Sequence, residues 1–412
     1  MSRLATGEEQ PASYRNLFGS VEYRGVLAAS ALSWMGDYLC RAAVALLVFD
    51  HTGSALASAA AFAVGYLPWL IAGPVLAAVA ERCRSRTVMI SCDLVRATLI
   101  GLMALPGAPI PVLLLLLFVS GLLAPPFEAA RSAQLPHILT GDRYALGLAF
   151  NNTISNICQV FGYAAGGAVA GYSPHAALLL NAGTFLGSAF LLRHYVRLRP
   201  ATLAACRRTG LWRETWQGYS VVFGDPVMRA IALIVFTTVT FVVVPEGLAA
   251  AWASELNGDG GAQGLIMAAN PLGVAIGGLL LSRLLSLRTR IRLIRSLALL
   301  APLTLFPALF DPPLVGVLFL VTGSGIVMAL LLPAAQALFR AVLPTEYRAR
   351  AFGVMNSGVQ VAQGAAILAT GALTERFPTS TVVGAWCGAG VLLILLVAFQ
   401  PLTLRARSAP TT

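Results

Sequence analysis

Long apolar segments follow one another along almost the whole chain, and each has about the length of a membrane-spanning helix. A helix needs about 20 largely apolar residues to cross the hydrocarbon core of a bilayer. Backbone polar groups cannot bond to lipid, so a spanning segment must satisfy them internally, as a helix does. Twelve segments meet this requirement, at residues 24–49, 55–80, 87–105, 110–130, 145–171, 175–195, 229–253, 261–284, 291–310, 312–339, 350–373 and 380–402. The sequence therefore predicts an all-α polytopic membrane protein with twelve transmembrane helices.

The charge content agrees with a membrane protein. Only 11% of the residues are charged, whereas soluble domains carry about 25%. The formal net charge is nevertheless +11, and all 28 basic residues are arginine. A basic balance can indicate a nucleic-acid partner, but arginines in the cytoplasmic loops of a membrane protein face anionic lipid and account for it. We expect a lipid bilayer around the protein and no nucleic-acid partner.

The arginines select one side of the predicted membrane. The two terminal segments and alternate connections between spans hold 25 of the 28 arginines. The opposite connections hold Arg376, and the remaining two, Arg41 and Arg96, lie inside spans. Because positive charge is retained in the cytoplasm, this pattern predicts that both termini are cytoplasmic. The exclusive use of arginine suggests a GC-rich bacterial genome, so we expect a multi-pass protein of the bacterial inner (plasma) membrane.

One hydrophilic stretch divides the spans into two sets of six. The predicted parts are a cytoplasmic N-terminal segment at 1–23, six-helix halves at 24–196 and 229–403, a cytoplasmic linker at 197–228 and a cytoplasmic tail at 404–412.

An internal repeat supports this division. When the chain is shifted by 204 residues, Gly167 falls on Gly371, and the amides of Asn152 and Gln159 fall on those of residues 356 and 363. A single offset without gaps predicts two parallel six-helix pseudo-repeats related by an axis along the membrane normal.

Several motifs resemble those of the major facilitator superfamily, and within it the branch that exports drugs and siderophores (macrolide-efflux-like and enterobactin-exporter-like proteins). Residues 36–41 read GDYLCR and residues 49–55 read FDHTGSA, similar to the GDW-xx-R and YD-xTGSA segments of that branch. Residues 92–97, CDLVRA, are similar to its ADLLRA segment. The resemblance covers essentially the whole chain and implies a twelve-helix transporter that works by alternating access.

Two further elements resemble the superfamily with departures. The loop at 73–86 is similar to the superfamily's G-xxx-DRxGRR loop, with Glu81 in place of the aspartate. The fifth span carries an element similar to the GPxxGG sequence of antiporters, with its glycines at Gly162, Gly166 and Gly167, but Tyr163 replaces the proline. The resemblance implies outward antiport, although its most diagnostic residue has changed.

Ionisable residues inside spans are costly and mark functional candidates. Asp37 lies midway along the first span, and Arg41 follows one turn later on the same face. Two interpretations stay open. Asp37 is either a site for a proton or a substrate cation with Arg41 as its charge partner, or one member of a permanent ion pair that holds the span against a neighbour.

Two further acids complete the proton-coupling candidates. Glu246 follows the helix-disturbing Pro245 in the seventh span, with no basic residue near it in sequence, and is the strongest of the three. Glu128 lies near the cytoplasmic end of the fourth span, one turn before Arg131, and a pair that closes the inner gate is an equal alternative. The resemblance implies that the first, fourth, seventh and tenth spans line the cavity, which would place all three acids there.

Five charged residues resemble the inner-gate network that locks the outward-facing state: Glu81, Arg82, Arg86, Asp93 and Arg96. We expect them to act on conformation rather than on the substrate.

Four aromatic residues are candidates for an apolar substrate cavity: Trp34, Tyr38, Phe127 and Phe241. Most aromatics in spans face lipid or core, so these positions are expectations only.

The chain also lacks the lysine that a Walker A loop or a Schiff-base site requires, so an ion gradient or the substrate's own gradient must supply the energy. Histidines and cysteines are scattered, and we expect no metal and no cofactor.

The leading hypothesis is a proton-coupled exporter of an amphipathic small molecule such as an antibiotic, dye or siderophore, acting as a monomer on its substrate and protons. The alternative within the same fold is a proton-coupled importer, against which the antiporter-like fifth span argues. An integral membrane enzyme or a scramblase is a third possibility. No nucleophile or His/acid cluster supports an enzyme, and the repeat would serve no obvious purpose there.

Overall fold

The computed structural model describes residues 17–68, 83–199, 211–281, 284–343 and 347–398. Over these residues the chain is all-α, and helix lies within each of the twelve expected spans. Seven helices of the described part are long and apolar enough to cross a membrane by themselves. The predicted fold class, an all-α polytopic membrane protein, is confirmed.

The N-terminal half contains α2 (Val21–Thr52), α3 (Ala55–Val64), α6 (Ser85–Met103), α7 (Ile110–Leu122), α8 (Ala124–Ile138), α9 (Asp142–Tyr172) and α10 (Pro174–Tyr195). Helix α11 (Leu211–Gly224) lies in the linker and packs against α12 and α20 of the second half. The C-terminal half contains α12 (Pro226–Val242), α13 (Val244–Gly247), α14 (Ala249–Glu255), α15 (Gly260–Ile276), the π-helical turn η1 (Gly277–Leu281), α17 (Leu287–Arg292), α18 (Ile294–Leu303), the 3-10 turn η2 (Phe306–Phe310), α19 (Leu314–Val342), α20 (Arg348–Thr374) and α21 (Thr379–Ala398).

The shortest connection shows how the sequence turns a helix back into the membrane. Helix α2 ends at Gly53, whose φ of 62° is left-handed and whose N–H donates to the Phe49 carbonyl at 2.7 Å. Glycine adopts this conformation without the steric cost that a Cβ brings. The next residue, Ser54, caps α3 by accepting from the Ala57 N–H at 3.0 Å. Two antiparallel helices are thereby joined with almost no loop.

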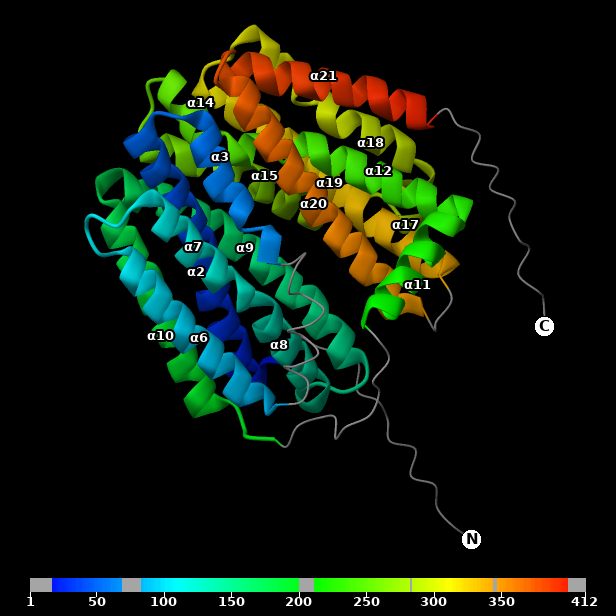
Figure 1. Cartoon of the computed structure of the whole chain (residues 1–412). Helices are drawn as coiled ribbons and strands as arrows, with labels where there is room; N and C mark the ends of the chain where they lie inside the picture. The colour runs from blue at the N-terminus through cyan, green and yellow to red at the C-terminus, as the bar shows by residue number, and fades with distance from the viewer. Residues whose placement is uncertain (1–16, 69–82, 200–210, 282–283, 344–346, 399–412) are drawn as a thin grey trace, which may run out of the picture.

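The two halves lie side by side (Figure 1) and meet at the end of the molecule that carries the α2–α3 and α20–α21 connections. Helix α9 packs against α15, and α3 packs against α20. A Cβ on Gly167 of α9 would lie 2.3 Å from the Gly260 carbonyl oxygen of α15, so only glycine permits this approach. A Cβ on Gly371 of α20 would lie 2.6 Å from the Ala59 Cβ of α3. The predicted repeat partners Gly167 and Gly371 therefore occupy equivalent contacts between the halves.

Contacts across this end include a polar one. The Glu375 carboxylate, just after α20, accepts from the Ser54 hydroxyl at 2.7 Å and from the Leu56 N–H at 2.9 Å. Nearby, the Gln263 side chain of α15 donates to the Ala42 carbonyl of α2 at 3.0 Å. The arginine pattern assigns this end to the outside of the cell. The halves are in close contact at this end.

Candidate functional site

Two adjoining cavities lie at the centre of the molecule, between the halves. The N-half cavity has a volume of about 560 Å³ and is lined mainly by α2, α7 and α8. The C-half cavity has a volume of about 640 Å³ and is lined mainly by α9, α12, α19 and α20. Three residues, Tyr38, Arg41 and Asn356, line both cavities and so mark where they join. These volumes are in the range of small-molecule binding sites.

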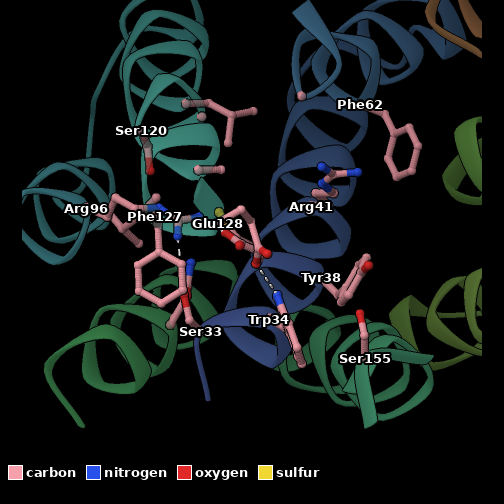
Figure 2. Close-up of a pocket in the computed structure, with 18 of the residues that line it drawn as sticks. Ser33, Trp34, Tyr38, Arg41, Phe62, Arg96, Ser120, Phe127, Glu128 and Ser155 are labelled. Atoms are coloured by element: carbon pink, nitrogen blue, oxygen red, sulfur yellow. Dashed lines mark hydrogen bonds and ion pairs between the residues drawn. The ribbon is translucent and has the colours of Figure 1, made fainter. Parts of the chain in front are cut away.

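The N-half cavity contains an ion pair between Asp37 of α2 and Arg96 of α6 (Figure 2 shows the Arg96 end). The Arg96 side chain is 3% exposed and that of Asp37 is 29% exposed. Arg96 also donates to the Ser33 hydroxyl at 3.3 Å, and its guanidinium carbon lies 4.2 Å from the centre of the Phe185 ring. These contacts hold the guanidinium against Asp37.

This arrangement differs from the expected partnership of Asp37 with Arg41. The two residues share a face of α2, as their spacing predicts, but no ion pair joins them among the described residues. Spacing along one helix identifies only neighbours on that helix. Here Arg96, anchored on a different helix, takes the carboxylate instead.

A second ion pair, within α8, lines the same cavity. Glu128 of α8 accepts from Arg131 at 2.5 and 3.0 Å. It also accepts from the Trp34 indole N–H of α2 at 2.7 Å, as Figure 2 shows. The Arg131 guanidinium carbon lies 4.8 Å from the centre of the Trp34 ring. The one-turn spacing of Glu128 and Arg131 predicted this pair. Its Trp34 partner, which ties α8 to α2, has no signal in the local sequence.

Arg41 occupies the junction of the two cavities without a carboxylate partner. Its guanidinium carbon lies 5.9 Å from the centre of the Tyr38 ring and 5.4 Å from that of Tyr66. It also lies 3.5 Å from where a Cβ on Gly65 would be, which is an ordinary van der Waals distance. Among the residues that the structure describes, no carboxylate lies within 4.0 Å of Arg41, and no acceptor takes its N–H groups.

Glu246 lines the C-half cavity. It lies in α13, a single turn between the breaks at Val243 and Leu248, where Pro245 helps to interrupt the helix. The carboxylate accepts from the Tyr163 hydroxyl of α9 at 3.3 Å, a bond between the two halves. Over the described residues it has no cationic side chain within 4.0 Å.

Amides related by the internal repeat surround the cavities. Asn152 and Asn356 both line the N-half cavity, and Gln159 and Gln363 both line the C-half cavity. Their common location explains why the repeat matches polar residues inside spans. At the cavity wall these amides can contact a polar group of a bound molecule.

The inner-gate candidates do not form one cluster in the described structure. Glu81 and Arg82 lie outside the described residues. The Arg86 side chain donates to the Arg193 carbonyl at 2.6 Å, while Asp93 is fully buried and accepts from the Ser188 hydroxyl at 2.6 Å. Arg86 and Arg96 are ten residues apart on α6, which separates them by about 15 Å along the helix axis. Arg96 therefore belongs to the cavity, well away from Arg86.

The aromatic candidates separate into two groups. Trp34, Tyr38 and Phe127 line the N-half cavity. Phe241, in contrast, is 6% exposed and packs 5.5 Å from Trp386 between ring centres, on the side of α12 that faces α21. Phe241 lines neither of the two cavities, because composition identifies an aromatic residue in a span but not the helix face that carries it.

The fifth-span glycines allow close helix packing in two directions. Cβ atoms on Gly162 and Gly166 would lie 2.7 and 2.8 Å from backbone atoms of α2, within the N-terminal half. Gly167 faces α15 across the interface between the halves. Tyr163, the residue in place of the expected proline, supplies the hydroxyl that reaches Glu246.

Nothing in the sequence indicated two contacts: that of the Tyr66 ring with Arg41, and that of the Glu375 carboxylate with the start of α3. Tyr66 lies in an apolar run that gives no information on its partner, and Glu375 sits in a short outer connection where charge is ordinary.

Comparisons with known proteins agree with this architecture. A family model described as Major Facilitator Superfamily matches residues 26–248 and 247–412. Two similar curated proteins are both described as uncharacterized MFS-type transporters. YfiS of Bacillus subtilis (strain 168) is 27% identical over 169 residues, 40% of each chain. Protein y4rN of Sinorhizobium fredii (strain NBRC 101917 / NGR234) is 28% identical over 233 residues, 55% of this chain and 56% of the relative. The chain thus spans about two fifths and about half of the length of these relatives.

Solved structures of transporters share the fold. The nucleoside transporter NupG superposes with a TM-score of 0.71 at 13% identity, covering 91% of this chain and 98% of that one. A bacterial homolog of the human lysosomal transporter Spinster, in an inward-facing and unoccupied conformation, superposes with a TM-score of 0.69 at 14% identity, covering 92% and 95%. At these identities the likeness shows the fold alone.

Proposed function

Because the chain belongs to the Major Facilitator Superfamily, we propose that it is a secondary active transporter that exports an amphipathic small molecule in exchange for protons. The two halves would alternate between an inward-facing and an outward-facing state. The location is the inner membrane of a bacterium, with both termini in the cytoplasm, and the working unit is a monomer.

The state of Glu246 is the observation that carries this proposal. Proton coupling needs an embedded group that can gain and lose a proton while the cavity opens to alternate sides. Asp37 and Glu128 are each engaged by an arginine in an ion pair. Glu246 has a single hydroxyl donor and lines the cavity at the boundary between the halves. It is therefore the acid best placed to exchange a proton.

The position of Glu246 also connects protonation to conformation. Its bond to Tyr163 joins α13 of one half to α9 of the other. Helix α9 carries Gly167, which forms the close contact with α15 at the predicted outer end. A proton on Glu246 changes the strength of the bond across the halves, because a hydrogen bond to a charged acceptor is stronger than one to a neutral acceptor. Loading and release of the proton would thus bias alternating access.

The cavity composition supports an amphipathic substrate. The C-half cavity combines apolar side chains of α12 and α19, such as Val239 and Leu332, with amides and with Glu246. The N-half cavity adds the charged and aromatic groups around Trp34. Ligand sites of this kind hold an apolar body and orient it with a few polar groups.

Transport in proteoliposomes with an imposed proton gradient tests the proposal, after a growth-inhibition panel in an efflux-deficient host has provided a transported compound. We expect the gradient to drive the compound in the direction opposite to the protons. Glu246→Gln should abolish this drive, and Asp37→Asn should weaken transport by releasing Arg96. Equal transport with the gradient collapsed and with both acids neutralised would contradict proton antiport.

A proton-coupled importer is the second candidate, and one observation favours it: Tyr163 stands where the antiporter-like element has proline. The same vesicles distinguish the two directions. An importer would move compound and protons the same way, and an exporter would move them in opposite ways.

A further inference from the structure

Two opposite charges in the central cavity form no ion pair within 4.0 Å among the residues that the structure describes. Asp37 is paired with Arg96, and Glu128 with Arg131. Arg41 and Glu246 both line the C-half cavity, and neither has an ion-pair partner among the residues that the structure describes. An unpaired charge away from bulk water is costly, and a ligand can supply the missing partner.

The Arg41 guanidinium is held in place while its donors stay available. Tyr38 and Tyr66 lie within 5.9 and 5.4 Å of its central carbon, and both are ring contacts rather than hydrogen bonds. A guanidinium offers five N–H donors in a planar fork that matches a carboxylate or phosphate with two parallel bonds. The absence of acceptors around Arg41 in the described structure leaves this fork for a ligand anion.

Glu246 presents the complementary group. A carboxylate accepts about four hydrogen bonds, and the structure gives Glu246 one, from Tyr163. The remaining acceptor capacity faces a cavity that Arg41 also lines. The rings of Tyr38 and Tyr163 meet edge to face with centres 5.1 Å apart, and they form aromatic surface between the two charged groups.

A ligand with one charge fits this cavity poorly. An anion bound at Arg41 is opposed by ionised Glu246, and a cation bound at Glu246 is opposed by Arg41. A molecule that carries both charges satisfies both groups. We infer that the cavity binds zwitterionic amphipathic molecules, with the anionic group on Arg41, the cationic group on Glu246 and the apolar body against the cavity tyrosines.

This assignment deepens the proposed function and rests on it for its physiological meaning. During substrate–proton antiport, the proton on Glu246 leaves to cavity water as the cationic group of the substrate approaches. The proton and the cationic group therefore compete for the Glu246 carboxylate. Arg41 keeps its charge throughout and anchors the anionic end.

A binding assay without any gradient tests the assignment. The probes are three forms of the tripeptide Gly-Lys-Gly with a dansyl fluorophore on the lysine side chain: free termini (zwitterion), C-terminal amide (cation) and N-acetylated with a free C-terminus (anion). The flexible spacer lets the two termini adjust to the site. Affinities are measured by dansyl fluorescence on the full chain in detergent at neutral pH, for the wild type, Arg41→Gln, Arg41→Lys and Glu246→Gln.

We expect the wild type to bind the zwitterion about tenfold more tightly than either singly charged form, which corresponds to about 1.4 kcal/mol. Arg41→Gln should erase the preference for zwitterion over cation, and Arg41→Lys should retain part of it. Glu246→Gln should erase the preference for zwitterion over anion. Ratios between probes on one variant are unaffected by partial unfolding, which lowers all three signals together.

Equal affinity of the wild type for the three probes, or no binding of the zwitterion at millimolar concentration, would overturn the assignment. So would an Arg41→Gln variant that keeps the wild-type ratio of zwitterion to cation. Because the assay involves no transport, a failure of proton coupling in vesicles leaves its result unchanged, and the two failures are distinguishable.

Discussion

The Asp37 carboxylate of α2 is bonded to the Arg96 guanidinium of α6, so Arg41, at the junction of the two cavities, has no ion-pair partner among the described residues. The pair fixes two helices of the N-terminal half relative to each other. It also occupies the Asp37 carboxylate with an arginine of another helix. The substrate-binding and proton-binding roles then fall to Arg41 and Glu246.

The first prediction concerns the stability of this pair. Arg96→Gln leaves Asp37 without its partner, and we expect a loss of about 2–4 kcal/mol, below the 3–5 kcal/mol of a fully enclosed pair because Asp37 is 29% exposed. Thermal unfolding of the purified protein in detergent measures it. The double variant Asp37→Asn/Arg96→Gln should recover part of the loss, since no buried charge remains unpaired. Arg41→Gln serves as the control, and a larger loss from Arg41→Gln than from Arg96→Gln would contradict the assigned pairing.

A second prediction concerns closure at the end where the halves meet. Gly167→Ala places a Cβ 2.3 Å from the Gly260 carbonyl oxygen, so the two helices must separate and the outward-open population should rise. Spin labels at the exposed Tyr172 and Phe310 positions, in a background without the native cysteines, should report longer distances across this end. Gly183→Ala is the matched control, because nothing lies within 4 Å of its added Cβ. Unchanged distances in Gly167→Ala would show that the glycine contact does not control closure.

The third prediction is a pH dependence of the same closure. The Leu56 N–H and the Ser54 hydroxyl bond the Glu375 carboxylate and lower its pKa from the ordinary 4.5. A carboxyl group whose pKa is lowered in the folded protein stabilises the protein fully at a pH above its ordinary pKa. This stabilisation is lost as the pH falls through the lowered pKa. We therefore expect closure to weaken below about pH 4.5 and to be constant between pH 5 and 7 with respect to this group. In Glu375→Gln the spin-label distances should be longer at neutral pH, and their change below pH 4.5 should be smaller. A wild-type distance that stays constant into the acid range would exclude a role for Glu375.

Most of the architecture followed from patterns that lipid imposes. Apolar length predicts spans because a bilayer has a fixed thickness. The repeat offset predicted that Gly167 and Gly371 are equivalent, and both now lie at the interface between the halves. It also matched Gln159 with Gln363, and both line the C-half cavity.

Partner choice between helices could not be predicted in the same way. Asp37 has an arginine one turn away on its own helix, yet Arg96 binds it because Ser33 and Phe185 hold that side chain in reach. Phe241 faces α21 instead of the cavity for a related reason: the rotation of α12 depends on its packing against neighbours. A single sequence carries no record of such contacts.

The most direct test of proton coupling compares net transport with exchange in Glu246→Gln proteoliposomes. Net transport of the identified compound against its gradient needs the proton to load and leave, whereas exchange of labelled for unlabelled compound does not. We predict that Glu246→Gln loses gradient-driven net transport and retains exchange once the compound concentration is raised to offset its weaker binding. Gradient-driven accumulation at the wild-type level in Glu246→Gln would contradict the account, because the proton would then bind elsewhere.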